Sequence, residues 1–84
     1  MTHLWPAGEL IQVDSDSLAV PQRFTWQGQS HGVRHVAKRW REDQGWWKQR
    51  IWREYFKIST DSGLLVIIYR DLVSGNWYIQ RWYN

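Results

Sequence analysis

The order of hydrophobic and polar residues along this chain predicts β-strands. Over residues 50–58 the two kinds alternate, and successive side chains of a strand point to opposite faces of its sheet. One face of this strand carries Ile51, Arg53, Tyr55 and Lys57, and the other carries Trp52, Glu54, Phe56 and Ile58. We therefore expect Trp52, Phe56 and Ile58 to point inward.

A turn motif earlier in the chain indicates a β-hairpin. The alternating segment that ends at Trp26 leads into Gln27-Gly28, and glycine readily adopts the positive φ that a two-residue hairpin turn requires. This turn would place Trp26 opposite Gln29 and Phe24 opposite His31. The return strand would continue over residues 33–40, with a β-bulge near residues 34–37 that reconciles its spacing.

The remaining segments complete a meander. Residues 41–49 have the composition of a loop. Residues 64–69 read LLVIIY, and a strand that is hydrophobic on both faces is normally covered on both sides. Two more strands are predicted at residues 9–13 and 77–83.

Strands that follow one another through short turns form an antiparallel sheet. The sequence therefore predicts an all-β fold, a single small antiparallel meander of about six strands that is curled as a partly open barrel or a two-layer sheet. We expect one domain over residues 1–84, in which residues 1–8 form a loosely ordered N-terminal segment.

Tryptophan supplies the core of this short chain. A domain of 84 residues buries only about 60% of its unfolded surface, and no cysteine is present to form a disulfide or a thiolate zinc site. Each of the eight tryptophans can bury roughly 150–250 Å². No hydrophobic run approaches the ~20 residues of a membrane span and the N-terminus lacks a signal-peptide pattern, so we expect a cytoplasmic protein without membrane association.

Positive charge is concentrated in the middle of the chain, although the net charge is only +3. Residues 22–57 carry nine lysines and arginines against three acidic residues, whereas residues 1–21 carry three acidic residues and no lysine or arginine. This distribution indicates a basic surface that would attract an acidic partner such as a nucleic acid.

The patterns of common catalytic and metal sites are absent from the sequence. His31 and His35 have the spacing of a helical zinc pair, but on a strand their Cα atoms would lie about 13 Å apart. Asp14-Ser15-Asp16 is more typical of a polar turn than of a cation loop. No serine lies in a nucleophile elbow, and no glycine pattern of a phosphate-binding loop is present. We expect a non-enzymatic protein without metal or cofactor.

The segment KRWREDQGWWKQRIWRE, residues 38–54, is the candidate binding surface. Nucleic-acid binders combine cations that neutralise phosphates with aromatic rings on which bases stack. Trp40 and Trp52 are expected in the core, because each lies in register with hydrophobic neighbours. The residues expected to bind nucleic acid or a partner are Arg39, Arg41, Trp46, Trp47, Lys48, Arg50 and Arg53.

Replacing Arg39, Arg41 and Arg50 together by alanine should then weaken the salt dependence of binding and leave Tm nearly unchanged. Two other functions fit the same sequence. Trp46 or Trp47 would anchor the hot spot of a protein–protein adaptor, or residues 77–83 would form a homodimer through an exposed edge strand. The lysines and arginines would otherwise serve only to keep exposed strands from aggregating.

Several short blocks of the chain resemble an uncharacterised family of short bacterial domains. The blocks are ELIQV at 9–13, RFTWQGQ at 23–29, VRHVAKRWRE at 33–42, GWW at 45–47, REYFKI at 53–58 and LLVIIYRDLVSGNWYIQRWYN at 64–84. Members occur alone or at the C-terminal end of proteins related to Y-family DNA polymerases, of the ImuB type that acts in error-prone translesion synthesis. The resemblance implies a compact β domain with a genomic or covalent association with DNA damage tolerance. It implies no particular catalytic or binding residue. From the basic and aromatic surface we expect single-stranded or duplex DNA, or a polymerase-related protein, as partner.

Overall fold

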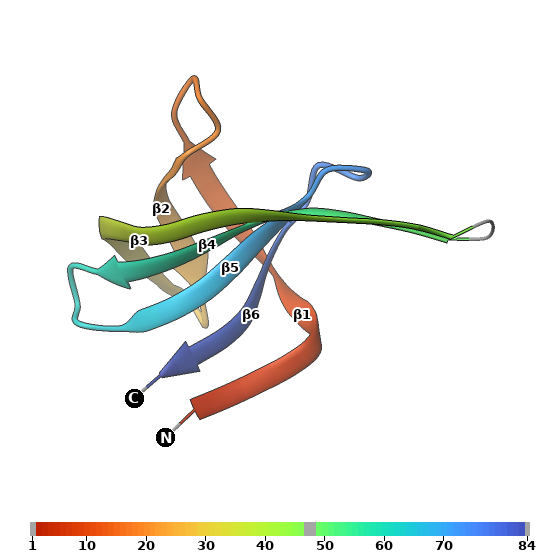
Figure 1. The fold of residues 1–84 in the computed structure, drawn as a ribbon. Coiled ribbons are helices and arrows are strands. Elements are labelled where there is room, and N and C mark those ends of the chain that lie inside the picture. Colours follow the sequence, from red (N-terminus) through yellow and green to blue (C-terminus); the bar gives the residue numbers. More distant parts are fainter. Residues whose placement is uncertain (1, 47–48, 84) are drawn as a thin grey trace.

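The computed structural model describes residues 2–46 and 49–83 of the chain, with side chains at residues 8–45 and 50–80. Figure 1 shows six strands that follow one another around a small barrel. The strands are β1 (Thr2–Ser15), β2 (Pro21–Trp26), β3 (Gln29–Trp46), β4 (Gln49–Thr60), β5 (Leu65–Asp71) and β6 (Trp77–Tyr83).

The six strands form an antiparallel meander that closes on itself. Each strand pairs with the next, and β1 also pairs with β6, so the barrel is closed. The predicted all-β meander is confirmed, and no helix occurs in the part of the chain that the structure describes. The proposed dimer edge at residues 77–83 was wrong, because β6 is hydrogen-bonded to β5 on one side and to β1 on the other.

The β2–β3 hairpin forms as its turn sequence predicts. Gln27 and Gly28 both have positive φ, 52° and 75°, which is the backbone of the tight turns that match strand twist. Phe24 lies opposite His31 and Trp26 lies opposite Gln29, which confirms the predicted register. His31 is buried against the Phe24 ring at 5.2 Å between centroids, and its Nδ1 lies 3.1 Å from the Ser62 hydroxyl.

Two strands extend further than the sequence suggested. β1 begins at Thr2, so it includes residues 2–8, which the sequence suggested would belong to a loosely ordered N-terminal segment. The loop prediction for residues 41–49 was wrong at residues 41–46 and 49, because β3 continues to Trp46 and β4 begins at Gln49; residues 47 and 48 lie outside the described residues. Each residue from 41 to 46 lies opposite a residue of β4, and polar composition alone does not reveal such pairing. The predicted bulge near residues 34–37 is confirmed by register shifts at Val33/His35 and Val36/Lys38.

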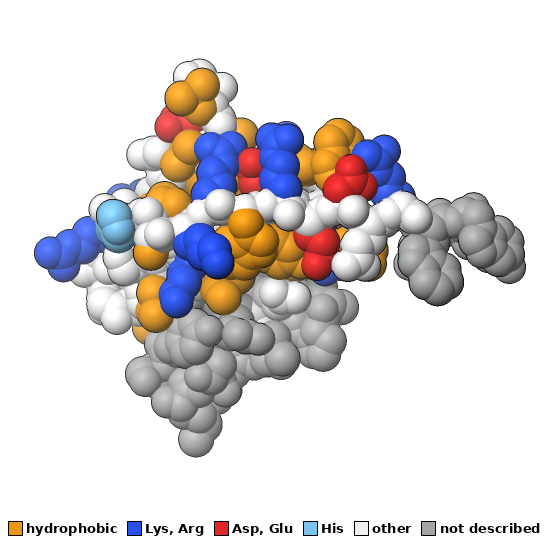
Figure 2. All heavy atoms as spheres, in the orientation of Figure 1, with side chains coloured by type: hydrophobic (Ala, Val, Ile, Leu, Met, Phe, Trp, Pro, Cys, Tyr) orange, Lys and Arg blue, Asp and Glu red, His pale blue; other side chains and the backbone are white. Residues whose placement is uncertain are grey.

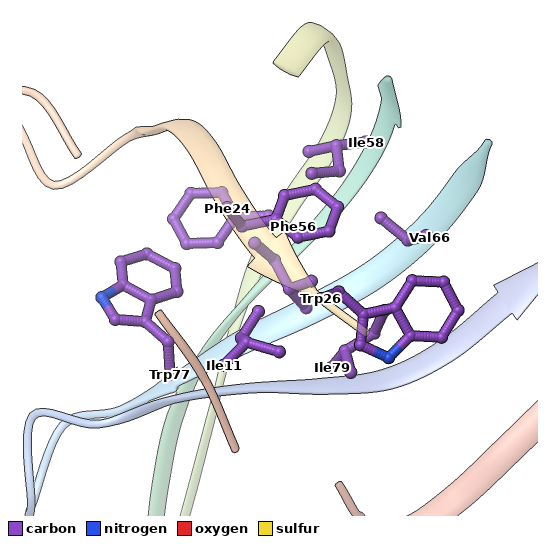
Figure 3. Close-up of a cluster of buried hydrophobic side chains, with 9 residues drawn as sticks. Ile11, Phe24, Trp26, Phe56, Ile58, Val66, Trp77 and Ile79 are labelled. Carbon is purple, nitrogen blue, oxygen red and sulfur yellow. The ribbon is translucent and has the colours of Figure 1, made fainter. Parts of the chain in front are cut away.

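Hydrophobic side chains from β1, β2, β4, β5 and β6 fill the barrel (Figure 3). Phe56, Ile58, Val66, Ile68 and Ile79 are fully buried there. β5 is covered on both faces as predicted, because Val66 and Ile68 point into this core while Ile67 and Tyr69 join a second cluster. Most of the side chains of β3 that the structure describes are therefore half-buried or exposed outside this core.

The β3–β4 hairpin projects beyond the barrel (Figure 1). The pairing of β4 with β5 ends at Arg53↔Asp71, whereas the pairing of β3 with β4 continues to Trp46↔Gln49. β2 pairs with β3 only as far as Gly32, so no strand among the described residues pairs with the outer edge of β3 beyond that point. The two faces and one edge of this hairpin are accessible to a partner.

Candidate nucleic-acid interface

On the inner face of the sheet, three charged residues and a tryptophan form a row that runs from the hairpin across the barrel wall. Arg41, Glu54, Arg70 and Trp77 lie directly opposite one another on β3, β4, β5 and β6. Glu54 is only 3% exposed although it is a carboxylate. A buried carboxylate requires cationic partners, because moving an isolated charge out of water is costly.

Two arginines from β3 converge on the Glu54 carboxylate. Arg39 donates through Nε and Nη2 to both oxygens, at 3.1 and 3.0 Å, and its guanidinium lies over the Phe56 ring at 5.1 Å from the centroid. Arg41 donates through Nε alone, at 3.0 Å. Three side chains that the β3–β4 register brings together thus form one ion-pair cluster at the end of the core.

The cluster lowers the pKa of Glu54. Burial by itself raises the pKa of this carboxyl, but the hydrogen bonds and charges of Arg39 and Arg41 outweigh burial and hold it below the ordinary value of 4.5. The ionised form is therefore favoured by folding.

Replacing Glu54 by glutamine is expected to lower the stability of the domain, and the loss should be largest at neutral pH. Since the folded pKa is lowered, the contribution of the carboxylate is fully present above the unfolded value of about 4.5 and is lost as pH falls through the folded pKa. The difference in Tm between wild type and Glu54→Gln should shrink as pH falls below about 4.5. Thermal melts followed by circular dichroism at a series of pH values measure it; a difference that stays constant would show that Glu54 is not the titrating group.

Two guanidinium groups on this face keep unused hydrogen-bond donors. Arg41 is 62% exposed, and within the described part of the chain its two Nη groups make no hydrogen bond. Arg70 makes no ion pair there, and its buried Nε has no hydrogen-bond partner. A guanidinium with free N–H groups presents the fork that matches phosphate oxygens.

Arg50 extends the same face towards the end of the hairpin. Its guanidinium lies over the Trp52 ring at 4.5 Å from the centroid and donates to Asp43 at 3.2 Å. Both partners of this ion pair are 54% exposed, so the pair contributes little to stability and is easily replaced by another anion. We call the following residues the charged face: Arg39, Arg41, Asp43, Arg50, Glu54 and Arg70.

The outer face of the same strands carries a row of aromatic rings. Trp40, Tyr55, Tyr69 and Tyr78 are successive cross-strand neighbours on β3, β4, β5 and β6, with centroids 5.1, 5.3 and 5.1 Å apart. Tyr55 and Tyr69 are buried in this aromatic row. Burial raises the pKa of the Tyr69 hydroxyl, although the charge of Arg53 opposes that rise.

Gly8 allows β1 to approach the far end of the aromatic row. Its φ is +77°, and a Cβ at this position would lie 2.9 Å from the Tyr78 Cβ and 3.1 Å from the Tyr69 ring. Backbone therefore packs closely on these two tyrosines, at a position where a larger residue would be strained.

The structure separates the predicted binding residues onto two faces. Arg39, Arg41 and Arg50 share the charged face, as their contacts with Glu54 and Asp43 show. Arg53 lies on the outer face, where it donates to the Tyr55 hydroxyl at 3.3 Å and covers the Tyr69 ring. The backbone of Trp46 belongs to β3. Trp47 and Lys48 lie outside the described residues.

Sequence reasoning missed the partners that organise these cations. Glu54 and Arg70 were not recognised as site residues, although a lone carboxylate on the inward face of an alternating strand signals a buried ion pair. Trp40 and Trp52, expected in the core, are half-buried: Trp40 lies at the edge of the outer cluster and Trp52 under Arg50. Among the described residues no group of three or more His, Asp or Glu is arranged to hold a metal ion, and no helix there is suited to crossing a membrane.

Comparison with known proteins places the chain in a family. The profile of the family described as "Domain of unknown function (DUF6504)" matches residues 6–83. The chain belongs to this family. This DUF6504 domain is also similar to Protein ImuB of Caulobacter vibrioides, in the strains NA1000 / CB15N and ATCC 19089 / CIP 103742 / CB 15, with 29% identity over 72 residues.

The match to ImuB covers 75% of this chain and 16% of ImuB, so the DUF6504 domain corresponds to a small part of that protein. The resemblance noted in the sequence blocks, to a short uncharacterised domain associated with ImuB-type proteins, is confirmed. No solved structure matches the chain.

Proposed function

We propose that this domain binds nucleic acid through its β3–β4 hairpin, as a non-enzymatic cytoplasmic accessory domain in DNA damage tolerance. The similarity to ImuB supports the association with damage tolerance. The geometry of the hairpin supports the binding itself, because its cations and aromatic rings gather on two strands, one of which has a free outer edge.

The surplus of positive charge on the charged face carries this proposal. Four guanidinium groups face two carboxylates there, Glu54 and Asp43. Figure 2 shows lysine and arginine side chains in a row along the hairpin, with acidic side chains among them. A cluster whose cations serve only to neutralise Glu54 would need neither the exposed Nη groups of Arg41 nor Arg70.

The charged face would bind by neutralising phosphates. Arg41 on β3 and Arg70 on β5 lie on either side of Glu54, so their backbones are separated by two strand spacings of about 4.7–4.9 Å each. Two guanidinium groups on one face of the sheet would each contact a phosphate of the same nucleic-acid chain. Binding of this kind releases counterions, so its affinity falls steeply as salt is added.

Fluorescence anisotropy of labelled single-stranded and duplex oligonucleotides, titrated with the wild-type domain over a range of salt concentrations, tests the proposal. We expect log K to fall linearly with log salt, with a slope of about −0.7 for each phosphate contacted on a single strand. Binding that is insensitive to salt, or no binding at low salt, would show that the charged face is not a phosphate site.

The free outer edge of β3 favours one second candidate, a protein–protein adaptor that docks on a polymerase-related partner. From Val33 onward this edge is unpaired by any described strand, and a strand of a partner can add to such an edge through backbone hydrogen bonds. Trp46 or Trp47 would anchor that partner. Affinity in this case would respond weakly to salt and strongly to truncation of a tryptophan.

A further inference from the structure

Two lysines face each other on the outer side of the hairpin. Lys38 on β3 is the direct cross-strand partner of Lys57 on β4. The side chains of such a pair point to the same face, with Cβ atoms about 4.5–5.5 Å apart, and two like charges at that distance destabilise the sheet. Neither lysine forms an ion pair within the described part of the chain. This pair is an uncompensated positive site.

The open end of the aromatic row lies beside this pair. One face of the Trp40 ring is covered by Tyr55, with centroids 5.1 Å apart and planes inclined by 6°. Tyr55 is followed by Tyr69 and Tyr78 on the next two strands, so the stack continues away from Trp40 in that direction only. Beyond Trp40 lies the outer edge of β3, which pairs with no described strand.

We propose that one nucleotide of a single-stranded nucleic acid binds here, with its base stacked on Trp40 as the next ring of the row and its phosphate between Lys38 and Lys57. This inference rests on the proposed function. It specifies that the nucleic acid is single-stranded and that stacking on Trp40 selects this form. Trp40 is half-buried, with its indole held in place by Tyr55, so stacking costs little further ordering of the ring.

The Lys38 side chain lies near the Trp40 ring on which the base would stack, so it would have to move when a base binds. Its Nζ lies 5.3 Å from the centroid of the Trp40 ring. An exposed contact between an ammonium and a ring is weaker than the stacking of a base on it. The base would therefore displace the lysine, whose flexible side chain can then reach the phosphate.

A single strand is required by the geometry of the stack. Bases in a duplex are already stacked on both sides and paired, so none of them offers a free face to Trp40. An unpaired base can leave its neighbours and extend the row. Because every base has a π-face, the site would show little preference for sequence.

Binding of a single-stranded oligo(dT) and of the same oligonucleotide with abasic sites, to wild type and to Trp40→Leu, tests this inference. We expect Trp40→Leu to weaken binding of oligo(dT) about tenfold and to leave binding of the abasic oligonucleotide nearly unchanged. Trp40→Phe keeps a flat ring on Tyr55 and should retain most of the affinity for oligo(dT).

A second variant tests the nucleotide site without altering the packing around the Trp40 indole. Lys38→Gln combined with Lys57→Gln leaves Trp40 in place, removes the like-charge pair and is expected to preserve Tm. It should lower the magnitude of the salt slope by about 0.7, which corresponds to one phosphate contact on a single strand.

The outcomes separate this inference from the proposed function. Salt-dependent binding of oligo(dT) that neither Trp40→Leu nor the lysine variant weakens would overturn the nucleotide site while leaving the charged face as the interface. Equal losses of oligo(dT) and abasic binding in Trp40→Leu would also overturn it. No binding of either oligonucleotide by the wild type would overturn the proposed function and this inference together.

Discussion

Replacing both Arg39 and Arg41 by alanine is expected to lower Tm by more than ten degrees. The change leaves the Glu54 carboxylate buried without the two arginines that it binds. Breaking a buried ion pair costs about 3 kcal/mol at the low end of its range, and we use the low end because both arginines reach solvent. For a domain of this size that loss corresponds to roughly 12–24 °C.

The pH dependence of stability identifies the cause of this loss. In the double variant the pKa of Glu54 should rise above its unfolded value, because burial is no longer opposed by two guanidinium groups. The variant should therefore be least stable at neutral pH and recover as pH falls, opposite in sign to the contribution of Glu54 in wild type. Adding Glu54→Gln should restore part of the lost Tm. A double variant that melts within a few degrees of wild type would show that Glu54 does not depend on these arginines.

This prediction revises the expectation drawn from the sequence, in which alanine at Arg39, Arg41 and Arg50 leaves Tm nearly unchanged. Loss of DNA binding in such a variant would not distinguish a lost contact from a lost fold. The ion-pair cluster therefore determines which substitutions can test function.

Replacing Arg41 and Arg50 together by glutamine is expected to weaken DNA binding between about ten- and a hundredfold at low salt. Arg39 still donates two hydrogen bonds to Glu54 in this variant, and the Arg50–Asp43 pair is exposed, so the fold should persist. Removal of two phosphate contacts should lower the magnitude of the salt slope by about 1.4 for a single strand. Anisotropy titrations at several salt concentrations, with Tm measured in parallel, give both quantities.

A matched control removes the same charge elsewhere. Arg23→Gln with Arg34→Gln alters two exposed arginines near the start of β3, where Arg23 lies opposite Gly32. Net charge falls equally in both double variants. If the two variants lose affinity to the same extent, the hairpin attracts DNA through overall charge and contains no specific phosphate contacts.

The barrel was largely predictable because its signals are local. Alternation over residues 50–58 placed Phe56 and Ile58 in the core, and the hydrophobic run at residues 64–69 indicated a strand covered on both faces. The Gln27-Gly28 turn alone determined the register of β2 with β3. Closure of the barrel was harder to predict from the sequence, because it depends on pairing between β1 and β6, at the two ends of the chain.

The candidate site was predictable only in part, because its geometry depends on residues distant in sequence. The cations of residues 38–54 were recognised from composition, but the face that each occupies follows from a register that includes two bulges. The roles of Glu54 and Arg70 follow from pairing with β3 and β5. Polar composition suggested a loop at residues 41–49, but backbone pairing between β3 and β4 continues there, with an Arg50–Asp43 ion pair across the hairpin and an Arg50–Trp52 cation–π contact along β4.

Two-dimensional NMR of the isotope-labelled domain, titrated with single-stranded oligo(dT) at low salt, tests the central claim most directly. Binding through the hairpin predicts that chemical-shift changes cluster on residues 38–46 of β3 and 49–57 of β4, with the indole signal of Trp40 among the most affected. Changes confined to other strands, or no changes at any ratio of DNA to protein, would contradict the assignment of the β3–β4 hairpin as a nucleic-acid interface.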